Sequence, residues 1–89
     1  MVRLFVRHQV AAYPAWRRVY DDFDSTRRSL GVAGAEVHQG LADPNDVTVW
    51  HDFATREQAL AFASSGAVRE AMAAAGVQGV PTIWVVANA

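Results

Sequence analysis

Two histidines stand out because each takes the place of an apolar residue in an alternating segment. His8 continues the alternating apolar series that starts at Val2, and His51 continues the series that starts at Val47. An alternation with a period of two is typical of a β-strand with one buried face. Because the pKa of an imidazole lies near neutral pH, a histidine on such a face could accept a proton from a bound molecule as a general base.

These histidines need strands and helices to position them, and the pattern predicts four strands and two helical segments. The strands are expected over residues 2–10, 33–39, 47–53 and 82–86. The first helix should begin at Pro14 and end at Gly31, because proline suits the first turn of a helix and glycine its left-handed end. The second begins after a capping box of Thr55 and Gln58, and a Ser-Ser-Gly sequence interrupts it before an Ala-rich second piece.

The order of these elements is β-α-β-β-α-β, which predicts an α+β protein with a single domain over residues 1–89. The usual arrangement is the ferredoxin-like fold, a four-stranded antiparallel sheet with the helices on one face. We expect the first and third strands to be central, adjacent and parallel. His8 and His51 would then face the helices at the same end of the sheet, the end at which both helices begin.

A buried pair of histidines has two interpretations. Two neighbouring imidazolium ions repel each other, so the pKa values of the pair would separate and one neutral histidine could serve as the base. Under this interpretation His8 and His51 are the catalytic residues. Alternatively, they are core residues whose nitrogens bond to each other, to Tyr13 or to the backbone.

An apolar pocket next to the histidines would complete a small-molecule site. The first helix carries aromatic side chains at helical spacing, and later elements add further apolar residues. The substrate-binding candidates are Tyr13, Trp16, Tyr20, Phe23, Phe53, Phe62 and Met72. The same stripe is also what an ordinary hydrophobic core would require.

The other face of the sheet would stay uncovered, and it carries large aromatic residues. The candidates for this face are Phe5, Trp50 and Trp84, although both faces of the last strand are apolar. An exposed aromatic face indicates an interface, and we expect two copies to pack sheet to sheet as a homodimer. Asp52 belongs to the same interface or pairs with Arg3 or Arg7.

Length and composition exclude several classes of protein. The chain has 89 residues, of which 52% are hydrophobic, and this favours one folded domain over a disordered tail. A net charge of −1 leaves no basic face for nucleic acid. The pairs Arg17–Arg18 and Arg27–Arg28 are typical of a solvated helix face. No apolar run approaches the ~18 residues of a membrane span and no signal peptide is recognised, so we expect a soluble, cytoplasmic protein.

Metal and cofactor chemistry have little support in the sequence. A catalytic metal usually has three protein ligands, and no third ligand accompanies His8 and His51 in a recognised spacing. The chain has no cysteine and therefore no thiol nucleophile. No P-loop, dinucleotide-binding or G-x-S-x-G motif occurs. We therefore expect no metal and no cofactor.

A resemblance to a known family is strongest in residues 49–62, which read VWHDFATREQALAF. They are similar to the antibiotic-biosynthesis-monooxygenase-like domains of the dimeric α/β-barrel superfamily, in which a strand ends in an aromatic residue and Thr, Glu, Ala and Phe follow. The element order fits over essentially the whole chain. The resemblance implies a ferredoxin-like fold that dimerises sheet to sheet into an α/β barrel. The superfamily includes cofactor-independent monooxygenases that oxidise aromatic polyketides, polyketide cyclases, haem-degrading enzymes, lactone isomerases and members without a known activity.

Two functions follow as expectations. The first is a small cofactor-independent enzyme that acts on an aromatic or polyketide-like molecule, with His8 or His51 as the base. Loss of a phenol proton would start an oxygenation, and the same abstraction would start an aldol-type cyclisation, so both reactions stay open. The second is a non-catalytic dimeric module, small-molecule-binding or stress-related, whose pocket is only a filled core.

Overall fold

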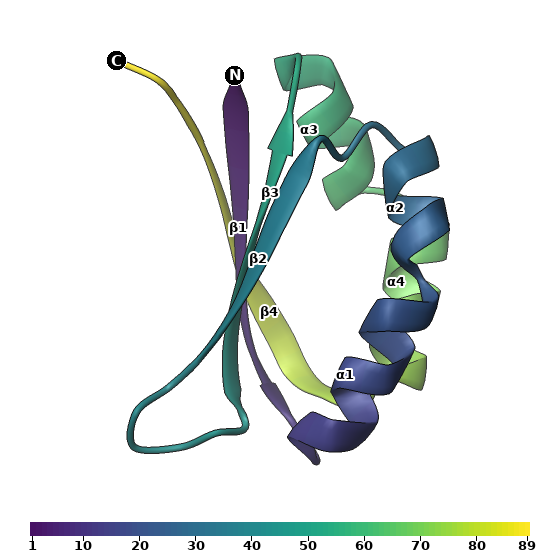
Figure 1. Cartoon of the computed structure of the whole chain (residues 1–89), viewed down its shortest axis with the longest axis vertical. Coiled ribbons are helices and arrows are strands. Elements are labelled where there is room, and N and C mark those ends of the chain that lie inside the picture. Colours follow the sequence, from purple (N-terminus) through teal and green to yellow (C-terminus); the bar gives the residue numbers. More distant parts are fainter.

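The computed structural model describes all 89 residues, which form four strands and four helices (Figure 1). In chain order these are β1 (Val2–Val10), α1 (Tyr13–Asp22), α2 (Asp24–Ser29), β2 (Gly34–Gln39), β3 (Asp46–Phe53), α3 (Arg56–Ala63), α4 (Gly66–Ala74) and β4 (Val77–Ala87). All the helices lie on one side of the sheet, and the other side is bare. None of the helices is long and apolar enough to cross a bilayer.

The strands form one antiparallel sheet in the order β2-β3-β1-β4. With helices on one face only, this is the ferredoxin-like fold that the element order predicts. β1 and β3 are central and adjacent as expected, but they are antiparallel, with Leu4 opposite His51 and His8 opposite Val47. The expectation of parallel strands was wrong because a short hairpin joins β2 to β3 and reverses the direction of β3 relative to both of its neighbours.

Alternation along the two central strands decides which residues face the helices. Every second residue of β1 from Leu4 to Val10 is buried, and so is every second residue of β3 from Val47 to Phe53. The residues between them are less buried and lie on the bare face. The period of two therefore predicts correctly which side chains of β1 and β3 belong to the core.

The first helical segment differs from the sequence prediction. A single helix through Leu30 was expected, but α1 and α2 meet at Phe23, whose N–H group bonds to the carbonyls of Val19 and Tyr20. This tightened turn changes the direction of the chain without a glycine or proline to mark it. The predicted interruption of the second segment is confirmed, because α3 ends just before it and Ser65 caps α4.

The last strand is longer than predicted and begins at Val77. Gly76 adopts a φ of 83°, which glycine tolerates without steric cost, and this turns the chain directly into β4. A bulge then places residues 79–81 opposite His8, between the pairs Arg7–Thr82 and Gln9–Gln78. The bulge allows β4 to continue past a glycine and a proline that would otherwise indicate a loop.

The buried side chains form two hydrophobic clusters between the sheet and the helices. The first contains Leu4, Val6, Phe53, Ala59, Phe62 and Val68. The second contains Val10, Trp16, Val47, Val49 and Ala75. His8 and His51 are buried in the same layer, with 7% and 4% of their surface exposed. The layer that stabilises the fold therefore also holds both candidate catalytic residues.

The capping box of α3 can be tested by mutation. The Thr55 hydroxyl accepts a hydrogen bond from the Gln58 N–H at 3.2 Å, and the Gln58 side chain accepts one from the Thr55 N–H at 3.3 Å. Thr55→Ala should lower the free energy of unfolding by about 1 kcal/mol, measured by urea denaturation. Ser25→Ala, which removes an exposed hydroxyl from α2, should change it by less than about 0.5 kcal/mol. Equal losses in the two variants would contradict the cap.

Candidate functional site

A cavity of about 60 Å³ lies between the sheet and the four helices, each of which contributes to its wall. Its wall takes Val6, Phe62 and Val68 from the first cluster, and Trp16, Val49 and Ala75 from the second. The cavity therefore lies between the two clusters of the core. His8, Tyr20, Arg27 and His51 are the polar residues that line it.

The antiparallel pairing separates the two histidines within this cavity. His8 and His51 differ by four positions along the paired strands, which is roughly 13 Å at ~3.3 Å per residue. Both imidazoles face the helices as predicted, but the close pair at one end of the sheet was wrong. α1 follows the end of β1 and α3 follows the end of β3, at opposite ends of the sheet (Figure 1). No group of three or more His, Cys, Asp and Glu side chains is arranged to hold a metal ion.

Aromatic rings of α1 fill the space between the histidines. The Trp16 ring lies 5.7 Å from the His8 ring and 4.8 Å from the Tyr20 ring, measured between centroids. The Tyr20 ring lies 6.2 Å from the His51 ring. A spacing of four residues places Trp16 and Tyr20 on the same face of the helix. A molecule that enters the cavity must therefore contact or displace these two rings.

Both histidines carry ring nitrogens without a hydrogen-bond partner. Neither nitrogen of His8 has a partner, and Nδ1 of His51 has none. Nε2 of His51 lies 3.4 Å from the Tyr20 hydroxyl. The interpretation in which these nitrogens bond to each other, to Tyr13 or to the backbone is therefore wrong. No protein group thus occupies these three nitrogens, and both histidines line the cavity.

Burial determines the charge of the cavity. Removal from water and, to a smaller extent, the positive charge of Arg27 together lower the pKa of His51 to about 4, against a smaller opposing effect of the Asp52 carboxylate. Burial also lowers the pKa of His8, against a smaller opposing effect of the Asp46 carboxylate. The pKa of the Tyr20 hydroxyl is raised, chiefly by burial. At neutral pH the cavity therefore presents two neutral imidazoles and a neutral phenol.

Arg27 is the functional residue that the sequence prediction missed. It was expected on a solvated helix face, but only 5% of its surface is exposed, and its guanidinium carbon lies 3.6 Å from the centroid of the Tyr20 ring. It donates hydrogen bonds to the Tyr20 carbonyl and, at 3.2 Å, to the Asp24 carboxylate. Helical spacing could have found it, because Tyr20, Phe23 and Arg27 follow the i, i+3, i+7 pattern of one face.

Five of the seven predicted substrate-binding residues line the cavity, and two do not. Trp16, Tyr20, Phe23, Phe62 and Met72 line the cavity. Tyr13 does not line it, because it lies one turn before Trp16 and packs against that ring at 5.9 Å. Phe53 does not line it either, because it is fully enclosed in the first cluster, 5.3 Å from Phe62. Small apolar residues such as Val19 and Ala71 complete the wall, and nothing in their sequence pattern distinguishes them from other core residues.

The low pKa of His51 predicts how stability depends on pH. The unfolded chain binds this proton with the ordinary pKa of 6.5 and the folded chain with a pKa of about 4. Protonation between these values therefore favours unfolding, so stability is complete above pH 6.5 and falls as the pH decreases toward 4. The loss attributable to His51 is about 3 kcal/mol.

His51→Phe should remove most of this loss, measured by urea denaturation at several pH values. Ser25→Ala, which removes an exposed and non-titrating side chain from α2, should keep the wild-type pH profile. A profile unchanged by His51→Phe would show that the imidazole is solvated.

Comparisons with known proteins agree with this geometry at the level of the fold. No protein-family model and no curated protein matches the chain. SnoaB, a cofactor-independent oxygenase from Streptomyces nogalater, has a solved structure that matches with a TM-score of 0.80 at 10% identity, over 99% of this chain and 92% of SnoaB. A Bordetella bronchiseptica protein provisionally named an antibiotic biosynthesis monooxygenase matches with a TM-score of 0.80 at 14% identity, over 99% and 96% of the two chains.

A further antibiotic biosynthesis monooxygenase structure matches with a TM-score of 0.75 at 8% identity, over 100% of this chain and 99% of the other. Identities this low concern the fold and not the chemistry. The resemblance drawn from residues 49–62 is confirmed at that level. The chain has the ferredoxin-like fold of these antibiotic biosynthesis monooxygenase structures.

Proposed function

We propose that the chain is a small cofactor-independent enzyme that acts on an aromatic or polyketide-like molecule, with His51 as the general base. The observation that carries this proposal is a buried, neutral imidazole with a free Nδ1 in the wall of an apolar cavity. A general base needs an unprotonated nitrogen that can reach the substrate proton. The fold shared with SnoaB, a cofactor-independent oxygenase, supports the same class of reaction.

The reaction would begin with transfer of a proton from a phenol or enol of the substrate to His51. The anion that forms is electron-rich and can react with dioxygen directly. When a ring methylene is oxidised, one oxygen atom of dioxygen replaces its two hydrogens and the other leaves as water. The same anion can instead attack a carbonyl of the molecule and close a ring, so the products distinguish a monooxygenase from a cyclase.

Proton transfer to His51 is uphill unless the site stabilises the anion. A phenol has a pKa near 10 and His51 has a pKa of about 4, and a gap of six units corresponds to roughly 8 kcal/mol. The imidazolium and the anion attract each other by about 4 kcal/mol at 4 Å with an effective dielectric constant near 20. This attraction offsets about half of the gap, so a second positive charge next to the anion is required.

His8 has a different part in this proposal. It lies at the other end of the cavity next to Trp16, whereas His51 lies next to Tyr20, whose ring contacts the Arg27 guanidinium that could stabilise an anion. We therefore assign His51 as the base. The free nitrogens of His8 would hold a polar group at the far end of a bound molecule.

Dioxygen uptake with hydroxylated naphthalenes and anthrones, together with mass spectrometry of the products, tests this function. His51→Gln should lower kcat by at least about 100-fold, because general-base catalysis contributes roughly 10²–10⁴. His38→Gln removes an exposed histidine and should keep kcat within about twofold of the wild type. Circular dichroism would verify that both variants fold. Full activity of folded His51→Gln, or no turnover of any phenol by the wild type, would contradict the proposal.

The size of the cavity favours a second candidate, the non-catalytic module. About 60 Å³ is far below the ~300–1,000 Å³ of a typical ligand pocket, and the stacked rings of Trp16 and Tyr20 fill much of the space. A module with a filled core would bind no aromatic probe. In such a module, His51→Phe would raise the free energy of unfolding and would have no effect on probe binding.

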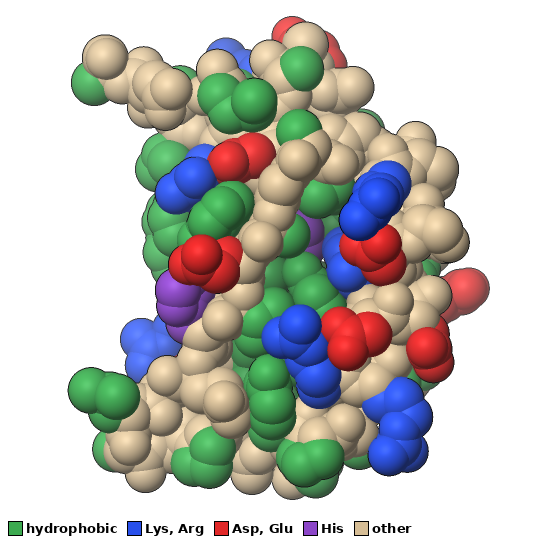
Figure 2. Space-filling model, viewed as in Figure 1, with side chains coloured by type: hydrophobic (Ala, Val, Ile, Leu, Met, Phe, Trp, Pro, Cys, Tyr) green, Lys and Arg blue, Asp and Glu red, His purple; other side chains and the backbone are tan.

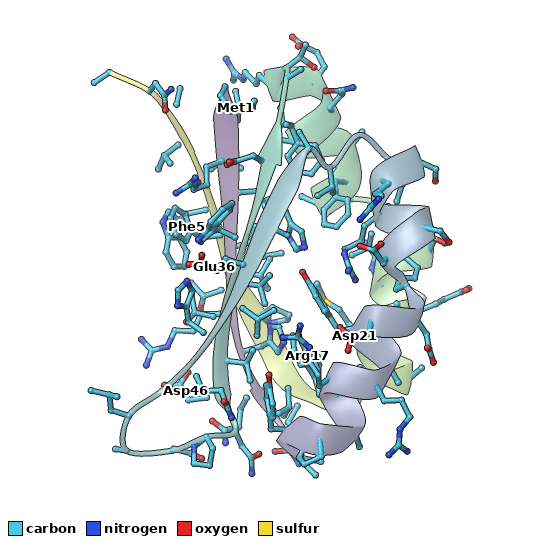
Figure 3. All side chains as sticks on the ribbon, in the orientation of Figure 1. Met1, Phe5, Arg17, Asp21, Glu36 and Asp46 are labelled. Atoms are coloured by element: carbon cyan, nitrogen blue, oxygen red, sulfur yellow. The ribbon has the colours of Figure 1, made fainter.

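We also propose that two copies pack through the bare face of the sheet. Phe5 and Trp84 stack there at 5.0 Å, and the Arg3 guanidinium lies 3.7 Å from the centroid of the Trp50 ring. Figure 3 shows Phe5 directed away from the helices. Arg3 also pairs with Asp52 through two hydrogen bonds of 2.8 and 3.0 Å within one chain. An apolar centre with internally paired charges around it suits a self-complementary interface.

Replacement of one exposed tryptophan tests this interface. Light scattering after size exclusion should give twice the chain mass of 9.7 kDa for the wild type and the single mass for Trp84→Asp, because the variant would bury an unpaired carboxylate. Leu41→Asp changes an equally apolar but fully exposed residue of the β2–β3 hairpin and should remain dimeric. A monomeric wild type, or a dimeric Trp84→Asp, would contradict the interface.

A further inference from the structure

A larger groove lies at the surface next to the inner cavity. The groove encloses about 940 Å³ between α1–α2 and the edge strand β2. Tyr20 and Arg27 line both spaces. Figure 2 shows hydrophobic side chains on the floor of this hollow and charged side chains along its helical side. Tyr20 and Arg27 therefore separate the groove from the cavity, and Arg27 stands where the two spaces meet.

The Arg27 guanidinium has unused binding capacity. Of its five N–H donors, one bonds to the Tyr20 carbonyl and one to the Asp24 carboxylate. Arg28 pairs with the other oxygen of Asp24 at 3.1 Å. Two guanidinium groups thus share one carboxylate, and Asp24 is half exposed to water. The charge of Arg27 is therefore only partly neutralised within the protein.

The other charged groups along the groove are engaged with one another. Arg17 pairs with Asp21 at 3.0 Å on α1, and both flank the groove (Figure 3). Glu36 lies on β2 with its carboxylate 2.7 Å from His38. Arg27 is consequently the cation that lines both the groove and the apolar cavity.

We propose that Arg27 binds the oxyanion of an aromatic ligand at the junction of the groove and the cavity. The inference rests on the proposed function and names its substrate class, an aromatic molecule with an acidic hydroxyl held as phenolate or enolate. The free N–H donors suit an oxyanion, since hydrogen bonds between charged partners are the strong ones. The ligand ring would lie against Tyr20, whose hydroxyl is 3.4 Å from Nε2 of His51. Arg27 thereby supplies the second positive charge that proton transfer to His51 requires.

4-Nitrophenol tests this assignment without any turnover, because its absorbance distinguishes phenol from phenolate. The wild type should lower the pKa of the bound probe by about one unit or more, since a cation within ~4–6 Å favours the anion to this extent. 4-Nitroanisole is the methyl ether of this probe and cannot ionise. It should bind at least about tenfold more weakly than nitrophenolate, because a pKa shift of one unit corresponds to a tenfold difference in affinity between the anion and the neutral form. Arg27→Gln should abolish both effects. Arg18→Gln, a control at an exposed arginine of α1 that lines neither space, should keep both.

Two further variants separate binding from folding, because Arg27 is buried. Arg27→Lys keeps the charge and should retain part of the shift. Asp24→Asn, at a half-exposed position, releases Arg27 from its carboxylate and should bind nitrophenolate at least about threefold more tightly.

No binding of 4-nitrophenol at millimolar concentration overturns the proposal, and so do equal shifts in the wild type and a folded Arg27→Gln. Nitrophenolate binding through Arg27, together with no turnover of any phenol, would instead remove the proposed enzyme and leave the anion site in place.

Discussion

The antiparallel pairing of β1 with β3 determines where the functional side chains lie. It places His8 and His51 four positions apart on the helix-facing side of the sheet, and this leaves room for two rings of α1 between them. A parallel pairing would have brought two imidazoles together, where their positive charges would repel. Instead each histidine has its own surroundings, with Trp16 next to His8 and Tyr20 next to His51.

The cavity places four polar side chains inside the hydrophobic layer of a small domain. A chain of this length buries only roughly 60–65% of its unfolded surface, and burial of an imidazole is less favourable than burial of an apolar side chain. The two hydrophobic clusters on either side of the cavity and the hydrogen bonds of the four-stranded sheet offset this cost. The unpartnered nitrogens are all imidazole nitrogens in the wall of one cavity and are not scattered through the core. Local violations of good packing are expected at functional sites, and this concentration is what distinguishes the cavity from ordinary core.

Much of the fold could be predicted from the sequence because its local rules are strong. The alternation of β1 and β3, the Thr55 capping box and the broken second helical segment all depend on neighbouring residues, and the structure confirms them. The direction of β3 relative to β1 could not be taken from the alternation, because a period of two is the same in parallel and antiparallel strands.

The site was less predictable because it depends on contacts between distant elements. Arg27 was assigned to solvent by its charge and by the arginine next to it, although its helical spacing places it with Tyr20 and Phe23. The burial of a cation depends on what packs over it, here the Tyr20 ring. In a single sequence, such packing is visible only as the helical periodicity of buried positions. The neighbouring Arg28 favoured a charged, exposed face instead.

The state of the His51 imidazole is the property on which the proposed chemistry depends. Its ring nitrogens can be observed by NMR across the acidic and neutral pH range, with and without 4-nitrophenol, and assigned with His51→Gln. We predict that the ring of the free protein stays neutral down to about pH 4. Bound nitrophenolate should raise this pKa, because a neighbouring anion stabilises the imidazolium. An imidazole that titrates near the ordinary 6.5 and does not respond to the probe would show a solvated histidine, and His51 could not be the base of a buried site.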